Sequence, residues 1–152
     1  GEALSTDWTD RTKVAFYDLL GDWSSISVVE HIADLGADVT YLTPVAGYAW
    51  KITRYSKTAI TSRLREAGVE IRVLRAGLSF IGNEFTVEDL STGKTECITV
   101  DAVIAAGNPA ARTDQYERLA VSGTGVTLVG DCLAPRSALE AVYEGHEVGR
   151  AL

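Results

Sequence analysis

The spacing of hydrophobic and polar positions alternates between a period of two and a period near 3.6, which predicts both strands and helices. Short runs rich in β-branched and aromatic residues, Lys13–Tyr17 and Val39–Thr43, indicate buried strands. Between them, apolar residues recur at helical spacing over residues 26–35, and Gly36 stands where a helix of this length ends. This strand–helix–strand segment has the size of a right-handed, parallel βαβ crossover.

The rest of the pattern predicts a second helix, a third strand, a β-hairpin, a further buried strand, a short helix, and a closing strand and helix. In order, these elements are expected over residues 57–67, 69–74, 85–90 with 95–100, 102–106, 114–119, 126–129 and 135–152. This order resembles the nucleotide-binding domains of flavin-dependent pyridine-nucleotide oxidoreductases. The predicted fold class is therefore α/β, a Rossmann-like FAD/NAD(P)-binding domain with a parallel sheet, helices and an inserted antiparallel β-meander.

Composition narrows the class of protein without naming a function. The 152 residues are 46% hydrophobic and 23% charged, which suits a globular domain rather than a disordered chain. The net charge of −7 argues against a nucleic-acid partner. No apolar run is long enough to span a membrane, and no secretory signal is visible, so we expect a cytoplasmic protein.

The loop after the first predicted strand lies where open α/β sheets bind nucleotides. A dinucleotide fingerprint needs several glycines so that the backbone can approach a pyrophosphate at a helix N-terminus. Here Gly21 is the one glycine, Trp23 adds bulk, and Ser24 and Ser25 can cap the following helix. The second strand also ends at Thr43 without the acidic residue that binds an adenosine ribose. The loop is either a modified nucleotide site or a degenerate one, and we expect NAD(P) binding to be weak or absent.

Two later loops are further candidates for cofactor binding. Gly107 follows a buried strand, and its turn either admits a cofactor or is only a tight strand–helix connection. Gly130 and Asp131 follow the predicted strand 126–129, just before the last helix. Asp131 could bind a ribitol or ribose hydroxyl while helix amides face a pyrophosphate, or it could merely be a helix-capping or turn aspartate.

The last helix carries Gly145 and Gly149 one turn apart, which indicates that something approaches that side closely. On or near one side, the same helix carries Leu139, Val142, Tyr143, His146 and Leu152. These residues predict an exposed apolar patch through which the chain self-associates or binds a missing segment. Its glutamates are most simply a solvated face. No catalytic residue and no metal-ligand cluster is predicted, and Cys97 and Cys132 are expected to be buried thiols.

Three segments resemble the C-terminal, nucleotide-binding region of multidomain old-yellow-enzyme-type NADH:flavin oxidoreductases, the relatives of trimethylamine and histamine dehydrogenases and of 2,4-dienoyl-CoA reductases. The most specific is VTLVGDCLAPRSALEAVYEGHEVGRAL at 126–152. KVAFYDLLGDWSSISVVEHIADLGADVTYLTP at 13–44 is similar to the start of their second nucleotide-binding domain, and AVIAAGNPAA at 102–111 is similar to a later strand and turn.

The resemblance implies a division of the chain and a set of cofactors. Residues 1–11 would be a tail, 12–119 an NAD(P)H-type domain, and 120–152 the closing strand and helix of an FAD- or ADP-type domain whose first half is absent. Gly130 and Asp131 would touch that flavin or ADP once the missing half-domain is present. FMN and an iron–sulfur cluster would belong to the parent protein, outside this chain.

The leading hypothesis is a C-terminal domain, fragment or small subunit of an FMN-dependent oxidoreductase, inactive by itself, whose partners are the missing upstream domains or a partner subunit. The departure at residues 21–25 favours the amine-dehydrogenase type. One alternative is a non-catalytic, stand-alone binding module. Another is a functional NAD(P)H-binding domain of a dienoyl-CoA-reductase-like enzyme.

Overall fold

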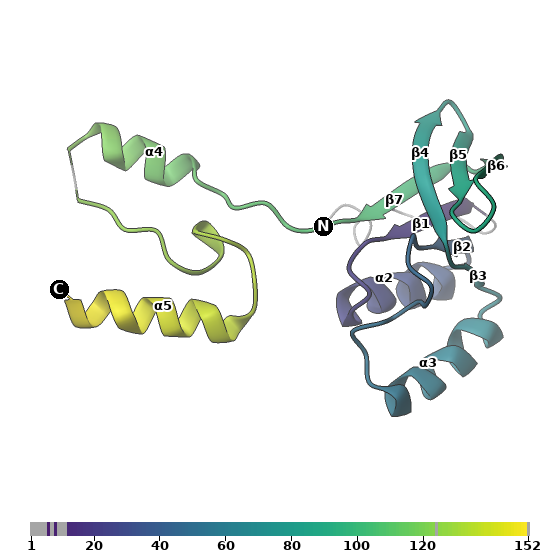
Figure 1. The fold of residues 1–152 in the computed structure, drawn as a ribbon, viewed down its shortest axis with the longest axis horizontal. Helices are drawn as coiled ribbons and strands as arrows, with labels where there is room; N and C mark the ends of the chain where they lie inside the picture. Colours follow the sequence, from purple (N-terminus) through teal and green to yellow (C-terminus); the bar gives the residue numbers. More distant parts are fainter. Residues whose placement is uncertain (1–5, 7, 9–11, 124, 152) are drawn as a thin grey trace. The chain divides into compact units, whose positions relative to one another are not determined.

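The computed structural model describes residues 6, 8, 12–123 and 125–151, which form two compact units, Gly1–Gly107 and Asn108–Leu152 (Figure 1). The first unit holds all the strands among these residues, and the second holds two helices and a short 3-10 turn. The resemblance implies a domain boundary at residue 120, whereas the two compact units divide after Gly107. The boundary at 120 refers to the domains of the parent protein and stays a prediction.

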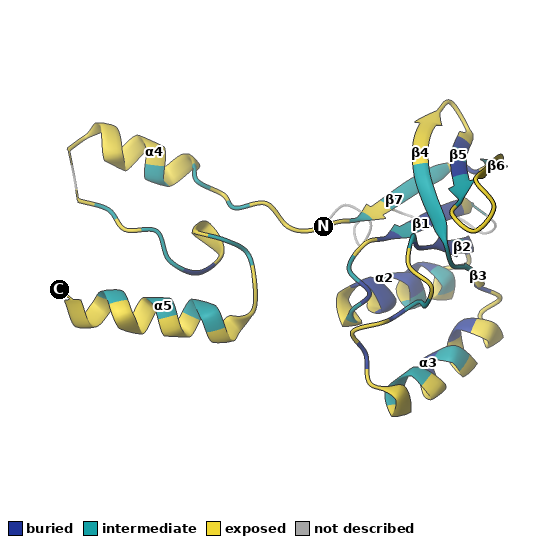
Figure 2. Ribbon diagram, in the orientation of Figure 1, coloured by how far each residue is buried: buried dark blue, intermediate teal, exposed yellow. Residues whose placement is uncertain are grey.

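A four-stranded parallel sheet in the order β3-β2-β1-β7 forms the centre of the first unit. Its strands are β1 (Lys13–Asp18), β2 (Asp38–Leu42), β3 (Glu70–Arg72) and β7 (Ala102–Ala106), with α2 (Trp23–Asp34) and α3 (Arg54–Glu66) as the connecting helices. Nearly every side chain of β1 and β2 is buried or half-buried, as expected for strands covered on both faces (Figure 2). The predicted Rossmann-like α/β class is confirmed.

The second sheet is an antiparallel meander in the order β4-β5-β6. It consists of β4 (Arg75–Ile81), β5 (Glu84–Asp89) and β6 (Lys94–Thr99), so the predicted hairpin and its polar turn are confirmed. The sequence pattern did not predict β4, because the strand is half-buried at its start and exposed along its second half, with a bulge near Gly77. Without a buried face, no alternation marks it.

Two apolar clusters hold these layers together. The larger one packs α2 and α3 on one face of the parallel sheet, and the smaller one packs the meander on the other. The fully buried side chains of the larger cluster include Val14, Phe16, Ile26, Val29, Ile32, Tyr41, Ile60 and Leu64. The smaller cluster contains Ala15, Leu42, Phe85, Val87 and Val100. Successive residues of β1 thus enter opposite cores, which follows from the period of two in a strand.

The second unit consists of α4 (Asp114–Val121), the 3-10 turn η1 (Gly130–Cys132) and α5 (Ala138–Ala151). The expected strand at 126–129 does not form, although the backbone at Val129 is extended. A strand needs a neighbour for its ladder of hydrogen bonds, and none of the described residues of this unit supplies one. The closing strand is therefore a wrong prediction for the chain as it stands.

The last helix begins at Ala138, three residues later than the expected start at Pro135. Ser137 and Glu140 form a capping box: the Glu140 carboxylate accepts from the Ser137 amide at 3.0 Å, and the Ser137 hydroxyl accepts from the Leu139 amide at 3.2 Å. The hydrogen bond from the Ser137 hydroxyl is the largest cause that lowers the pKa of Glu140. Glu140 is therefore a capping residue, and the interpretation of it as merely solvated is wrong.

Candidate functional site

The loop at the carboxyl end of β1 is organised around one buried carboxylate. Asp18 is completely buried, and its oxygens accept hydrogen bonds from the amide of Leu20 at 2.8 Å and the amide of Gly21 at 3.1 Å. The Ser25 hydroxyl donates to it at 2.6 Å, and the Tyr41 hydroxyl donates to its other oxygen. Two backbone amides that face the loop are thus satisfied by the chain's own anion.

Burial raises the pKa of Tyr41 above its ordinary value, and the hydrogen bond to Asp18 and the negative charge of Asp18 raise it further. The phenol is therefore a neutral donor to the carboxylate over the physiological pH range. Because Tyr41 lies on β2, this hydrogen bond fixes the loop after β1 to the neighbouring strand.

A second carboxylate completes the same loop. Asp22 is the N-cap of α2, and its side chain accepts from the amides of Ser24 at 3.0 Å and Ser25 at 3.3 Å. The sequence pattern assigned the cap to Ser24 or Ser25, and that assignment is wrong: Asp22 caps, and the Ser25 hydroxyl turns inward to Asp18. The amides at the start of α2 that could bind a phosphate are occupied by Asp22.

The space above Gly21 is filled by an aromatic ring. Gly21 has φ +64°, and a Cβ built on it would overlap the indole of Trp50. The amide of Lys51 donates to the Gly21 carbonyl at 2.9 Å, which holds this segment against the loop. Trp23, to which the sequence pattern assigned the added bulk, is half-exposed. Trp50 is the residue that occupies the place where a fingerprint glycine would admit a pyrophosphate.

Gly107 lies at the neighbouring strand end. β7 pairs with β1, with Asp18 opposite Ala106, and the Leu19 amide donates to the Ala106 carbonyl at 2.9 Å. Gly107 is exposed, and a Cβ built on it would meet no described atom within 4 Å. Gly21 and Gly107 thus belong to the same edge of the sheet, Gly21 covered and Gly107 open.

In the second unit, Gly130 is buried and has φ +59°, with the Cβ of Ala141 only 3.1 Å from where its own Cβ would be. Its amide donates to a carboxylate oxygen of Glu144 at 2.7 Å, and Arg136 pairs with the other oxygen. Glu144, like Glu140, is therefore part of the internal structure rather than a solvated face. These contacts dock η1 on α5, and only glycine fits there without strain.

Asp131 follows Gly130 and is exposed. Its carboxylate has no hydrogen bond or ion pair with any residue in the described part of the chain, so it does not cap α5. The helix-cap alternative for Asp131 is wrong, since Ser137 and Glu140 fill that role. The alternative of a turn aspartate agrees with the structure, because Asp131 is the central residue of the 3-10 turn η1. A carboxylate free at the end of an extended segment remains available for a hydroxyl of a ligand.

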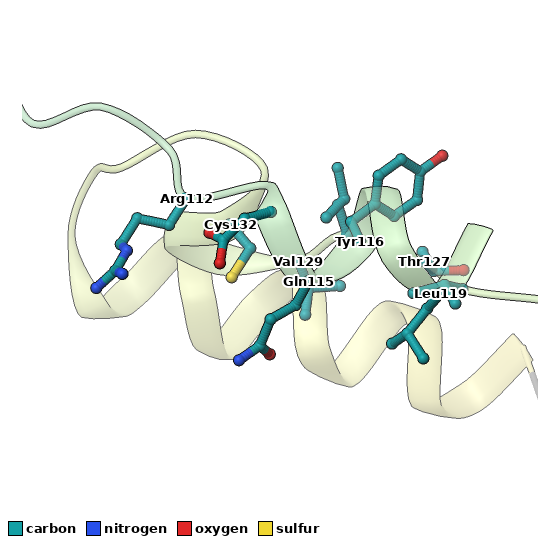
Figure 3. Close-up of a pocket in the computed structure, with 10 residues that line it drawn as sticks. Arg112, Gln115, Tyr116, Leu119, Thr127, Val129 and Cys132 are labelled. Carbon is teal, nitrogen blue, oxygen red and sulfur yellow. The ribbon is translucent and has the colours of Figure 1, made fainter. Parts of the chain in front are cut away.

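A cavity of about 390 Å³ lies beside this loop, within the range of small-molecule pockets (Figure 3). Side chains from α4, from the extended segment and from η1 line it. The lining residues are Arg112, Asp114, Gln115, Tyr116, Leu119, Val126, Thr127, Leu128, Val129 and Cys132. The sequence pattern marks the loop but not this cavity, because the contribution of α4 depends on how the chain folds back, and no motif predicts that.

The exposed face of α5 agrees with the expected apolar patch. Leu139 is 75% exposed, Val142 72% and Tyr143 63%. Cβ atoms built at Gly145 and Gly149 would meet open space, so no described residue makes the close approach that these glycines suggest. The predicted exposure is confirmed, while its use in association stays a prediction.

The two cysteines lie on the surface. Cys97 and Cys132 are both exposed and free, so the expectation that they are buried is wrong. Cys97 faces out of β6 because that strand lies at the edge of the meander, with most of its side chains in solvent.

Two further features are absent from the described residues. Among them, no group of three or more His, Cys, Asp or Glu could hold a metal ion. Across the same part of the chain, every helix is too short or too polar to cross a membrane.

Comparison with solved structures confirms the expected resemblance. Histamine dehydrogenase from Rhizobium sp. 4-9 superposes with a TM-score of 0.86 and 26% identity, covering 97% of this chain. The 6-hydroxypseudooxynicotine amine oxidase from Pseudomonas geniculata N1 gives a TM-score of 0.82 and 25% identity over 92% of the chain. A 2-naphthoyl-CoA reductase shares the fold at a TM-score of 0.75, 20% identity and 95% coverage.

This chain spans only a part of each of these neighbours, 23% of the histamine dehydrogenase, 22% of the amine oxidase and 21% of the reductase. No protein-family model matches the sequence, and no curated protein sequence matches it either. The chain is thus similar in structure to a region of larger oxidoreductases.

Proposed function

We propose that this chain is the C-terminal region, as a domain, fragment or small subunit, of an FMN-dependent oxidoreductase of the amine-dehydrogenase type. The observation that carries the proposal is the superposition on histamine dehydrogenase over 97% of the chain at a TM-score of 0.86. The FMN, the substrate and an iron–sulfur cluster would belong to upstream domains, which the larger size of the neighbours supports. The chain alone would be inactive.

Residues 12–119, which include the sheets and helices of the first unit, would be an NAD(P)H-type domain whose nucleotide site is degenerate. Three sets of contacts support this. Asp18 accepts hydrogen bonds from the amides of Leu20 and Gly21, and Asp22 accepts from two amides at the start of α2. The ring of Trp50 covers Gly21. A dinucleotide would have to displace an aromatic ring and bring its phosphates against two carboxylates. The residues present do not fit this cofactor. The alternative of a working NAD(P)H domain is disfavoured for the same reason.

Residues 120–152, which form most of the second unit, would be the closing part of an FAD- or ADP-type domain, with the first half of that domain supplied upstream. The free carboxylate of Asp131 would bind a ribose or ribitol hydroxyl, and the cavity beside it would hold part of the ligand. The Gly130 amide already donates to Glu144, so it would position the loop and leave the anion to other donors. The lack of a strand partner at 126–129 supports a missing half-domain.

Two measurements test the proposal. Calorimetric titration of the chain with NADH and NADPH should show no binding at micromolar concentrations; a micromolar Kd, about 8 kcal/mol, would refute the degenerate site. Titration with ADP should likewise show no tight binding until the upstream segment is present.

The second measurement is the intact mass of the native gene product and of the proteins that copurify with it. We expect either a polypeptide about four times the length of this chain, as in the neighbours, or a partner subunit that carries a flavin. A flavin-free product of 152 residues without a partner would instead support the stand-alone binding module.

A further inference from the structure

The positive charge of this acidic chain is concentrated on one element. Residues 51–66, which include α3, carry five basic residues and one acidic residue, a net charge of +4. The rest of the chain carries nine basic and twenty acidic residues, a net charge of −11. A chain of net charge −7 thus presents one basic helix in an otherwise acidic molecule.

Most of these cations are not used by the fold. Arg63 is the only one with an ion pair to a described residue, with Glu30 at 2.7 Å, and Lys57 lies 4.3 Å from the centre of the Tyr48 ring. Arg54 and Arg65 are exposed, and neither pairs with an acid in the described part of the chain. Their charges therefore face solvent rather than stabilising the domain.

The unpaired charges share a face of α3 with an aromatic side chain. Ile60 and Leu64 are completely buried and fix the inner side of the helix. Arg54, Thr58, Ser62 and Arg65 are all exposed and follow one another at intervals of three or four residues, which places them on one outer side of the helix. Tyr55, 91% exposed, lies beside them. We call Arg54, Tyr55, Thr58, Ser62 and Arg65 the α3 face.

We propose that the α3 face docks an acidic surface of a partner protein, in addition to the contacts that complete the second unit. Arginine and tyrosine are the side chains enriched where proteins bind one another, because each combines a large contact area with directional hydrogen bonds. The hydroxyls between the two arginines are held within the helix: Thr58 donates to the Arg54 carbonyl at 3.2 Å, and Ser62 donates to the Glu66 carboxylate at 2.9 Å. Glu66 is the one acidic residue beside this face, so the arginines and Tyr55 are the groups that would contact the partner. Opposite charge on the partner would steer its approach and set its orientation.

The charge pattern favours a protein over a nucleic acid. A nucleic acid is an extended polyanion, and beyond this helix it would meet a surface with a net charge of −11. A compact acidic patch on a protein can contact α3 alone, without meeting the acidic residues of the rest of the chain. A second copy of the chain is acidic overall, so self-association through this face is an alternative occupant that the experiment separates.

The test uses the full chain and a fluorescein-labelled oligoglutamate of about twelve residues as the acidic probe. Fluorescence anisotropy at low salt should show binding that weakens as salt is raised. Arg54→Glu with Arg65→Glu should weaken it at least about tenfold. The matched control, Arg118→Glu with Arg150→Glu, makes the same change in net charge on two exposed arginines of the second unit, and should stay within about threefold.

Several outcomes would overturn the proposal. These are no binding by the wild-type chain, an equal loss in both charge-reversed variants, or tighter binding of a twelve-nucleotide single strand than of the oligoglutamate. A dimer seen by sedimentation that Arg54→Glu with Arg65→Glu dissolves would identify a second copy as the occupant, and would also overturn it. Circular dichroism of each variant, together with the neutral pair Arg54→Gln and Arg65→Gln, separates lost binding from lost folding. Calorimetric titration with NADH should be as negative for these variants as for the wild-type chain, because none of the substitutions touches the loop after β1. The degenerate nucleotide site therefore fails or stands separately from the α3 face.

Discussion

Asp18 should be the most sensitive polar residue of the first unit, because its carboxylate is buried and accepts hydrogen bonds from four donors. Asp18→Ala removes the acceptor and leaves the amides of Leu20 and Gly21 and the hydroxyls of Ser25 and Tyr41 without their partner. Asp18→Asn has the same shape but removes the charge and replaces one acceptor oxygen with a donor. The two variants therefore separate the loss of hydrogen bonds from the loss of charge.

The expected magnitudes follow from these contacts. A buried donor left unsatisfied costs about 1–3 kcal/mol, and removing one partner from a buried charged cluster costs about 3–5 kcal/mol. We expect about 4 kcal/mol for Asp18→Ala and about 2 kcal/mol for Asp18→Asn, since the amide oxygen can still accept from two donors. Ser25→Ala, which removes one donor, should cost about 1 kcal/mol. In the two Asp18 variants, removing the desolvated charge offsets part of the loss.

Urea unfolding followed by tryptophan fluorescence measures these values in the first unit alone, because Trp8, Trp23 and Trp50 all lie in it. The matched control is Asp38→Ala, which removes an exposed aspartate at the start of β2 and should change the unfolding free energy by less than about 0.5 kcal/mol. A cost below about 1 kcal/mol for Asp18→Ala would show that the network around Asp18 does not stabilise the fold, and would refute the argument.

Three further predictions concern other parts of the molecule. Because burial and Asp18 raise the pKa of Tyr41, the unfolded chain loses the phenolic proton first, so stability should be full below about pH 10 and fall as the pH rises further; urea midpoints between pH 8 and 11 should show a shallower fall in Tyr41→Phe. Shortening the exposed turn at 91–94 while keeping Gly93 should change the unfolding free energy by less than about 1 kcal/mol, and a chain that no longer folds would contradict this. Leu139→Lys with Val142→Lys should make a self-associating chain monomeric in sedimentation while tryptophan fluorescence shows the first unit still folded; if the wild type is monomeric and the variant unfolds, α5 belongs to the chain's own core.

Much of the fold could be predicted from the sequence, because its strands and helices pack locally. β1 and β2 are largely buried and therefore show as mostly apolar runs. β7 has an equally apolar sequence, but the expectation of a buried strand is wrong there: it lies at the edge of the sheet, half-buried, with Ala105 exposed. β4 could not be predicted, since its exposed half lacks any alternation. The segment 126–129 has the composition of a strand, but composition cannot show whether a neighbouring strand exists to pair with it.

The position of the candidate site could be predicted from the sequence, but the side chains that close it could not. The position of the loop after β1 follows from topology alone, and the lack of glycines there predicted a poor nucleotide site. The residue that closes the site, Trp50, comes from an irregular segment about thirty residues later, and its contact with Gly21 depends on how that segment folds back. Likewise, periodicity could not distinguish Asp18 as a buried acceptor from an ordinary turn aspartate, because its partners Ser25 and Tyr41 lie on two other elements.

The second unit buries only Gly130 among the residues described between 108 and 151, so its helices of eight and fourteen residues have no interior to pack against. Helices of that length are marginal in water unless an apolar face is covered. Their order is then governed by mass action: a partner that binds only the folded form adds RT ln(1 + [L]/Kd), about 2.7 kcal/mol at a hundredfold excess over Kd. Amide hydrogens of α4 and α5 should exchange rapidly with deuterium in the chain alone and slowly in the complex, while those of β1 and α2 stay protected in both. The two units would thus fold with separate free energies, and that of the second unit would depend on the concentration of its partner.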